Sequence, residues 1–443
     1  MYPNLYYVFK DWFNVSWEWL KLLNTFGLFV ALAFLVAIFI LREELKRKEK
    51  LGLLFPRELS VEIGKPASWF DLISNAVVGF IFGAKIFGFI FSKPPEVNPQ
   101  DYIFSTQGNI LGGLVFAAFL VGIKWYEANK QKLKTPEKRV LRIWPHDRVG
   151  DIFVIALVTG ILGAKLFDNF EHWDEFVKDP IGKIFSQSGL TFYGGLILAS
   201  FSVCFYAYKK GIKLSHLVDS AAACLLLAYA IGRIGCQVSG DGDWGIFNSA
   251  YTADANGNLS LAAPGDFEKT LQKNNTYFLS GNIKDSTGKD LYVTDRIYKS
   301  LEDVPHKSVK GVSFLPKWFF AYSYPQNVNK DGILMLSSTE EHRFSLPAPV
   351  FPTPLYETII CTLLFLFMWA IRKKIKTPWV MFGIYLVLNG IERFVVEMIR
   401  VNISYKVSGF ALSQAQEIAV MLIVAGVGLI VFGKIRARKM GSN

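Results

Sequence analysis

The sequence predicts an all-α integral membrane bundle of about nine transmembrane helices, with a small α+β or β-containing extracytoplasmic head domain inserted before the last three helices. Two observations support this fold class. The 443 residues are 51% hydrophobic and 15% aromatic, and their apolar runs reach the roughly 20 residues that a helix needs to cross a bilayer. A polar stretch from 237 to 350, rich in Asn, Gly, Lys and Asp, interrupts these runs and predicts the head domain.

Apolar runs give the expected positions of the helices. Residues 1–236 contain the first six spans, 237–350 the head domain, and 351–443 the last three spans with a basic cytoplasmic tail. The expected spans are 22–42, 70–91, 108–126, 151–168, 189–208, 217–236, 352–371, 378–398 and 412–433.

Basic residues predict the orientation of these spans. Clusters such as REELKRKEK and KIRARK follow the odd-numbered spans, whereas an alternate loop such as DNFEHWDEFVKDP has no such cluster. Because Lys and Arg gather on the cytoplasmic side, we expect the N-terminus outside and the C-terminus in the cytoplasm. Orientation also accounts for the net charge of +11, so no nucleic-acid partner is expected. Charges rather than a small-residue site follow the first apolar run, so no cleaved signal peptide is expected.

The chain also contains an internal repeat. FDLISNAVVGFIFGAKIF at 70–87 resembles GDIFVIALVTGILGAKLF at 150–167, and the helices that follow them are similar too. A helical hairpin is therefore expected twice, over 70–126 and 150–209. Repeats are common in transporters, which leaves a lipid or anion transporter as an alternative function. Against transport, the two copies have equal orientation and concern two helices only.

Two arginines continue apolar runs without a polar break, Arg233 in AYAIGRIGC and Arg393 in LVLNGIERFVVEMIR. A guanidinium inside a bilayer helix costs roughly 2.5 to 3.5 kcal/mol on an insertion scale, so such residues usually serve an anionic ligand. Glu397 follows Arg393 by one helical turn and can hold it in position. The alternatives are a snorkelling Arg233 and a purely structural pair of Arg393 with Glu397. Because both arginines are expected at the outer leaflet, a shared lipid phosphate is the preferred interpretation.

A glycine-rich loop, within GRIGCQVSGDGDWG, follows Arg233 and lets backbone amides approach a ligand closely. Asp241 and Asp243 lie in this loop, where turn or helix-capping residues are the alternative interpretation. The five histidines have no metal-ligand spacing and the cysteines form no CxxC units, so neither a metal nor a cofactor is expected. All four cysteines lie in or beside apolar spans, which excludes a disulfide-stapled head.

These motifs, together with TFYGGLI, FPTPLYET and ALSQAQEIAVMLIVAG, resemble motifs of the bacterial prolipoprotein diacylglyceryl transferases. The resemblance covers most of 150–236 and 350–433, and part of the first span. It implies transfer of the diacylglyceryl group from phosphatidylglycerol to the lipobox cysteine thiol of a preprolipoprotein, with a thioether formed and glycerol 1-phosphate released. It also implies a bacterial inner-membrane protein whose active cavity opens to the outer leaflet, where the lipid and the signal peptide meet. Another enzyme acting on the phosphatidylglycerol headgroup is the alternative.

The resemblance also implies roles for individual residues. We expect Arg233 and Arg393 to bind the phosphate and Glu397 to orient Arg393. Asp241 is the first candidate to accept the thiol proton or to orient the group that does, and Asp243 could substitute for it. The chain departs from the family pattern where Tyr193 replaces the histidine before the paired glycines, and Tyr193 is the second candidate base. Candidate substrate-binding residues are Gly194, Gly195, Gly235, Gly240, Gly245, Glu397, Asp243 and Lys165, the last of which either adds positive potential or snorkels.

Overall fold

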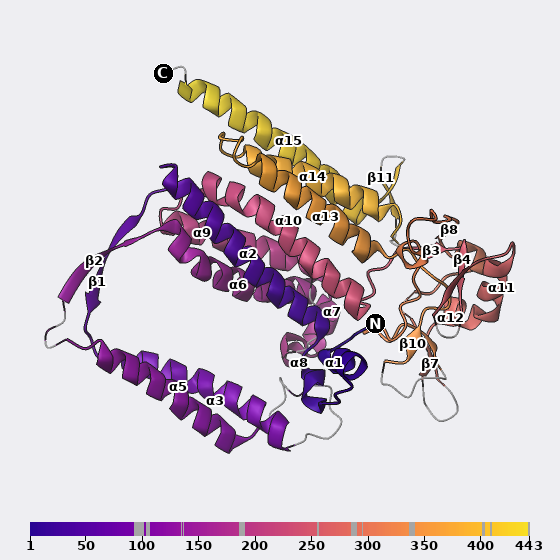
Figure 1. The fold of residues 1–443 in the computed structure, drawn as a ribbon, viewed down its shortest axis with the longest axis horizontal. Coiled ribbons are helices and arrows are strands. Elements are labelled where there is room, and N and C mark those ends of the chain that lie inside the picture. Colours follow the sequence, from indigo (N-terminus) through magenta and orange to yellow (C-terminus); the bar gives the residue numbers. More distant parts are fainter. Residues whose placement is uncertain are drawn as a thin grey trace. The chain divides into compact units, whose positions relative to one another are not determined.

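Long helices dominate the computed structural model of the chain (Figure 1). The structure describes residues 1–92, 102, 107–133, 135, 137–185, 191–254, 257–284, 290–294, 296–335, 342–400, 404–407 and 410–441. The chain divides into two compact units, each with its own set of packed helices. The first unit is Met1–Leu41 with Ser215–Asn443, and the second is Arg42–Leu214.

Each predicted span coincides with a helix. Among the described residues, seven helices are long and apolar enough to cross a membrane. Two further helices, α9 (Phe192–Lys209) and α14 (Val380–Glu397), occupy the remaining predicted positions but are not among these seven. Residues 189–190, at the start of the predicted span 189–208, lie outside the described residues. An α-helical membrane protein is therefore confirmed, whereas nine crossings remain a prediction. The seven helices are α2 (Thr25–Lys50), α3 (Trp69–Ser92), α5 (Ile110–Lys130), α6 (Val149–Glu171), α10 (Leu214–Ser239), α13 (Thr353–Ile371) and α15 (Gln414–Gly441).

In the first unit, α2, α10, α13, α14 and α15 form a bundle (Figure 1). Small residues let α14 and α15 approach closely, since a Cβ atom added at Gly383 would lie 2.8 Å from the carbonyl oxygen of Gly426. Between α10 and α13 the core is apolar and includes the fully buried Leu226 and Met368. This bundle fixes the ends of the helices that carry the predicted site.

The second unit contains two helical hairpins with the same kind of contact. Helix α3 packs on α5, and a Cβ atom at Gly83 would lie 2.6 Å from the carbonyl oxygen of Gly112. Helix α6 packs on α9, and a Cβ atom at Gly163 would lie 2.5 Å from the carbonyl oxygen of Gly194. The unit also has short helices α7 (Trp173–Lys178) and α8 (Pro180–Phe185), and an antiparallel ribbon of β1 (Arg57–Ile63) and β2 (Glu137–Ile143) that the sequence did not predict.

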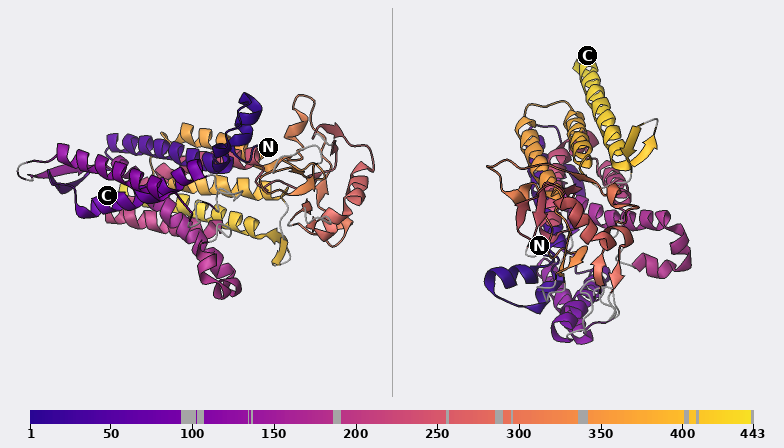
Figure 2. Two further views of the ribbon diagram at one scale, coloured as in Figure 1. Left: turned by 90° about the horizontal axis from the view of Figure 1, so that it is seen from below. Right: turned by 90° about the vertical axis from the view of Figure 1, so that its right-hand side faces the viewer.

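Short elements follow α10 and gather at one end of the first unit's bundle, as Figure 1 and the left view of Figure 2 show. Their core contains the fully buried Phe278, Tyr324 and Val350. Residues 237–350 thus contain short strands and helices, whereas their assignment as a head domain outside the cytoplasm remains a prediction. The elements are β3 (Phe247–Asn248) parallel to β8 (His306–Lys307), the pair β4 (Tyr251–Ala253) and β5 (Leu259–Leu261), a sheet in the order β10 (Phe344–Ser345), β9 (Gly332–Leu334), β7 (Asp290–Val293) and β6 (Ile283–Lys284), and helices α11 (Asp266–Lys273) and α12 (Asn275–Ser280).

Some ends differ from the expected ones. Helix α2 continues through Lys50, so the basic segment after the first predicted span is helical rather than a loop. Ion pairs one turn apart, such as Lys46 with Glu43 at 3.1 Å, stabilise this extension. Two other elements were not expected: α1 (Leu5–Phe13) before the first span, and the hairpin of β11 (Ser404–Val407) and β12 (Phe410–Ser413) before the last.

Candidate active site

Helix α10 ends in a sharp turn that brings the two loop aspartates beside Arg233. Gly240 and Gly242 adopt φ angles of 69° and 70°, in the left-handed region that glycine occupies without steric cost. The backbone N–H groups of Gly240 and Asp241 both donate to the carbonyl oxygen of Cys236, at 3.0 and 3.1 Å, and close the helix. Asp241 and Asp243 therefore follow the last turn of α10 directly.

Backbone hydrogen bonds attach this loop to two other helices. The N–H of Gly245 donates to the carbonyl oxygen of Phe351 at 2.8 Å, just before α13 begins. The N–H of Ile246 donates to the carbonyl oxygen of Ile399 at 2.8 Å, just after α14 ends. Residues from α10, α13 and α14 are thereby assembled at one place.

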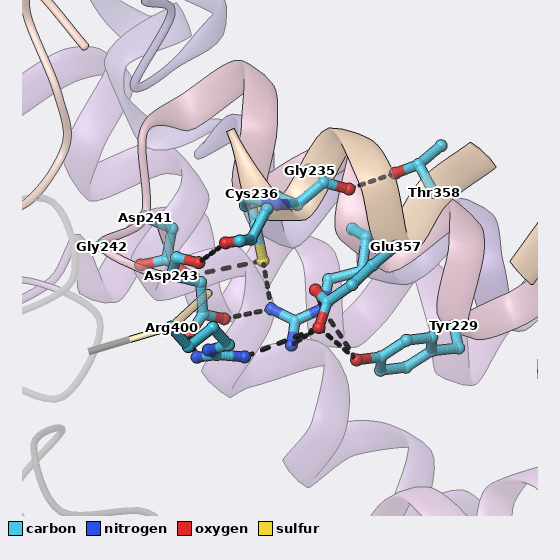
Figure 3. A network of polar contacts seen from close by, with 12 residues as sticks. Tyr229, Gly235, Cys236, Asp241, Gly242, Asp243, Glu357, Thr358 and Arg400 are labelled. Carbon is cyan, nitrogen blue, oxygen red and sulfur yellow. Dashed lines mark hydrogen bonds and ion pairs between the residues drawn. The ribbon is translucent and has the colours of Figure 1, made fainter. Parts of the chain in front are cut away.

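Arg233 makes several polar contacts in the resulting network. Its partners Tyr229, Asp243 and Glu357 are labelled in Figure 3. Its Nε is 2.6 Å from Oε2 of Glu357 and donates to the hydroxyl oxygen of Tyr229 at 3.1 Å. Its Nη1 forms an ion pair with Oδ2 of Asp243. Only 11% of the Arg233 side chain is exposed, so these contacts replace most of its hydration.

Arg393 and Arg400 contact the same carboxylate. Nη1 of Arg393 is 3.4 Å from Oε1 of Glu357, and Nη1 of Arg400 is 3.6 Å from that oxygen. Arg393 also pairs with Glu397, with 3.5 Å between Nη2 and Oε2, which is the contact that the sequence predicted. Glu357 has no exposed side-chain surface, and three guanidinium groups share its charge. Arg233 and Arg393, from two separate helices, therefore converge as expected.

Asp241 lies next to a thiol and has an altered pKa. Its Oδ2 is 3.8 Å from Sγ of Cys236, and that sulfur is 3.7 Å from Nη1 of Arg233. Burial, together with the nearby Asp243, raises the pKa of Asp241 to about 6. A carboxylate with this pKa is mostly ionised at neutral pH and is a stronger base than an ordinary aspartate.

Asp243 has the opposite electrostatic environment. Its two carboxylate oxygens pair with different arginines, Oδ2 with Arg233 and Oδ1 with Arg400. Burial alone would raise the pKa of Asp243, but the two guanidinium groups lower it below the ordinary value. A carboxylate paired with two arginines is a weak proton acceptor, so Asp243 is a weaker base than Asp241 in this arrangement, and its role as a substitute base remains a prediction.

Two of the predicted glycines, Gly235 in α10 and Gly245 in the loop after it, occupy tightly packed positions. A Cβ atom at Gly235 would lie 2.9 Å from Cβ of Phe29, and one at Gly245 would lie 2.5 Å from the carbonyl oxygen of Ile399. Gly240 has a positive φ angle and ends α10. Packing and turn geometry thus give a reason for each glycine, and a contact with substrate remains a prediction.

Four predicted site residues belong to the second unit. Lys165 is on α6, and Tyr193, Gly194 and Gly195 are in the first turn of α9. The two glycines lie against α6, where a Cβ atom at Gly195 would be 2.8 Å from the carbonyl oxygen of Gly160. Their participation in the same active site as Arg233 remains a prediction.

The sequence interpretation underestimated Glu357 and Arg400. Glu357 is not among the predicted site residues, although a carboxyl group in the second turn of an apolar helix is itself a signal of a buried charged partner. Arg400 is not among them either; α14 ends at Glu397, and Arg400 reaches the cluster through its β-bridge with Gly245. Within the described part of the chain, no three or more His, Cys, Asp or Glu side chains are arranged to hold a metal ion.

Comparisons with known proteins agree with the resemblance. The family model of prolipoprotein diacylglyceryl transferase matches residues 111–432. A phosphatidylglycerol–prolipoprotein diacylglyceryl transferase from Shouchella clausii is 22% identical over 343 residues, which cover 77% of this chain and 92% of the relative. Proteins of the same name from Dehalococcoides mccartyi strain BAV1 and Streptococcus pyogenes serotype M49 are 37% identical over 95 residues and 34% identical over 128 residues. These shorter matches cover 21% and 28% of this chain, and 36% and 44% of the relatives.

Proposed function

The chain belongs to the prolipoprotein diacylglyceryl transferase family, and we propose that it transfers the diacylglyceryl group of phosphatidylglycerol to a prolipoprotein. Family membership supports the reaction, and the observation that carries the site assignment is the convergence of Arg233 and Arg393 on Glu357. Arginines clustered at the ends of apolar helices suit a substrate that is a phosphate ester embedded in a membrane.

In the proposed reaction, the thiol of the lipobox cysteine attacks the glycerol carbon that carries the phosphate ester. A carbon–sulfur bond forms, the carbon–oxygen bond breaks, and glycerol 1-phosphate leaves with the bonding electrons. Negative charge therefore grows on the departing phosphate, and Arg233 and Arg393 stabilise it. Glu357 and Glu397 hold the two guanidinium groups in place before the substrate arrives, so little reorganisation is needed during the reaction.

Asp241 accepts the thiol proton in this proposal. A free cysteine thiol has a pKa of about 8.5, so only a few per cent is thiolate at pH 7 and a nearby base accelerates attack. The position of Asp241 supports the role, because its carboxylate already lies 3.8 Å from one sulfur atom, that of Cys236. Tyr193 is the second candidate base, and Gly194, Gly195 and Lys165 contribute to substrate binding.

We further propose nine crossings of the bacterial inner membrane, with the N-terminus outside, the C-terminus in the cytoplasm and the active site at the outer leaflet. Two observations support this topology. Residues 237–350 connect the end of α10 to the start of α13, where Arg233 and Glu357 lie. The basic segments lie at the opposite helix ends: RKKIK follows the C-terminal end of α13, and KIRARK lies near the C-terminal end of α15. Basic residues favour the cytoplasmic side, which assigns the arginine cluster and the 237–350 region to the outside.

Transfer can be tested with purified protein, phosphatidylglycerol labelled in the diacylglyceryl group, and a lipobox peptide. Label is expected to move to the peptide thiol, and a peptide with serine in place of the cysteine should remain unlabelled. Headgroup release without peptide labelling would instead indicate another phosphatidylglycerol-headgroup enzyme. No chemical change to the lipid would contradict the proposal and favour transport.

Two arginine variants provide a matched comparison. Arg233→Lys retains the charge but not the forked geometry that binds two phosphate oxygens, so transfer should fall at least about tenfold. Arg142→Lys makes the same change at an exposed residue of β2, whose side chain is 72% exposed and 3.1 Å from Glu58. The Arg142 variant should transfer at the wild-type rate. Equal rates for both variants would remove Arg233 from the mechanism.

A further inference from the structure

Asp243 makes the contacts that a phosphate group would be expected to make. Its two carboxylate oxygens bind two guanidinium groups that come from different parts of the chain, Arg233 on α10 and Arg400 after α14. Arginine binds carboxylate and phosphate with the same forked arrangement of N–H donors. Asp243 and a bound phosphate therefore require the same donors.

The charges of the cluster make this competition important. Among the described residues, three arginines of the cluster form ion pairs with three carboxylates, so these groups balance one another. The carboxylates are not equally accessible: the side chains of Glu357 and Glu397 are 0% and 1% exposed, whereas that of Asp243 is 33% exposed. Asp243 is thus the carboxylate that a ligand can replace. The arginines of the cluster are Arg233, Arg393 and Arg400.

The backbone near Asp243 is held independently of its side chain. The hydroxyl of Thr353 donates to the carbonyl oxygen of Asp243 at 2.5 Å, and Nη2 of Arg296 donates to the carbonyl oxygen of Gly242 at 2.9 Å. A rotation of the carboxylate away from the arginines therefore leaves the loop attached to α13. Release of the guanidinium groups requires a side-chain movement only, which is fast compared with enzymatic turnover.

We propose that Asp243 is an internal competitor for the substrate phosphate. It leaves Arg233 and Arg400 when the phosphate of the lipid binds between them, and it returns as glycerol 1-phosphate departs. This inference rests on the proposed function and adds two points to it: Arg400 is a third phosphate-binding arginine, and Asp243 limits how tightly the product is retained. Without Asp243, only Glu357 and Glu397 would oppose the three arginines, so the site would bind its phosphate product more strongly and release it more slowly.

The test measures phosphate binding to the full-length protein carrying Asp243→Asn, a substitution close in shape to aspartate. Inorganic phosphate and phosphatidylglycerol in neutral detergent micelles are titrated in separate arms. We expect the variant to bind about tenfold more tightly, a change equivalent to about 1.4 kcal/mol, and glycerol 1-phosphate to inhibit it more strongly. Tighter binding in both arms supports competition for phosphate itself, and tighter binding of the lipid alone supports competition for the esterified headgroup.

Asp241→Asn is the matched control, because it removes a negative charge from the same loop without releasing a guanidinium ion pair. Its effect on phosphate binding should be below about twofold, since no donor is freed. Asp243→Ser provides a second uncharged variant if Asp243→Asn does not fold. Unchanged or weaker phosphate binding in a folded Asp243 variant overturns the inference, because the carboxylate then only positions the arginines. These binding measurements require no transfer, so they separate failure of this inference from failure of the proposed function.

Discussion

Substitution of Asp241 tests the proposed proton acceptor most directly. The carboxylate lies in the loop after α10, 3.8 Å from the Cys236 sulfur, and burial with the nearby Asp243 raises its pKa to about 6. The ionised form is the base, so kcat/KM should rise as the pH increases through about 6 and then level off. Asp241→Asn removes both the base and this acidic limb of the pH profile.

The magnitudes follow from the pKa. With a pKa of about 6, roughly a tenth of the carboxyl groups are ionised at pH 5 and roughly nine-tenths at pH 7. Ionisation of Asp241 should therefore increase kcat/KM about tenfold between these pH values. Loss of a positioned base typically costs about 10² to 10⁴ in rate, so transfer by Asp241→Asn should fall by a factor in this range.

Initial rates of label transfer to the peptide, measured at limiting substrate from pH 5 to pH 8, give the profile. Asp174→Asn is the control, because Asp174 is an exposed aspartate of α7. Its profile should match that of the wild type. If Asp241→Asn instead retained the full rate and a midpoint near pH 6, another group would be the base, and Tyr193→Phe would be examined next.

Three other substitutions have effects that the contacts predict. Glu357→Gln leaves three guanidinium groups without their shared counter-charge, so it should lower the free energy of unfolding in detergent by about 3 to 5 kcal/mol, measured by denaturant titration; an unchanged value would contradict this role. Arg393→Lys should reduce kcat/KM about 10- to 100-fold with an unchanged unfolding midpoint, and a loss of stability instead would indicate a structural ion pair. Gly163→Ala would place a Cβ atom 2.5 Å from the carbonyl oxygen of Gly194 and should destabilise the second unit by about 1 to 3 kcal/mol in thermal unfolding, whereas Gly150→Ala, with no atom within 4 Å, should not.

Helix positions could be predicted from the sequence because long apolar runs have few stable alternatives in a bilayer. Helix ends were less predictable, since charge does not by itself end a helix. In α2, Glu44 and Arg47 lie one turn apart and pair at 2.5 Å, which favours continuation of the helix. The pairing of the short strands in the 237–350 region could not be predicted, because strands of two to four residues carry little periodicity and pair with distant partners, as β3 does with β8.

The candidate site was partly predictable for a related reason. Arg233 and Arg393 stand out because they interrupt apolar sequence, and the pair of Arg393 with Glu397 follows from helical spacing. The centre of the cluster does not follow from any one segment. Glu357 meets three arginines only because α13 begins where α10 and α14 end, which is a property of the folded chain.

The way in which the site is assembled determines how its arginines act. Backbone hydrogen bonds from Gly245 to Phe351 and from Ile246 to Ile399 attach the loop to the ends of two helices without involving any side chain. The buried Glu357 orients the guanidinium groups, so their charges are already positioned in the absence of a substrate. Preorganised charge of this kind stabilises a transition state because reorganisation has been completed during folding. The arginines should therefore contribute to the rate of phosphate departure more than to the affinity for the lipid.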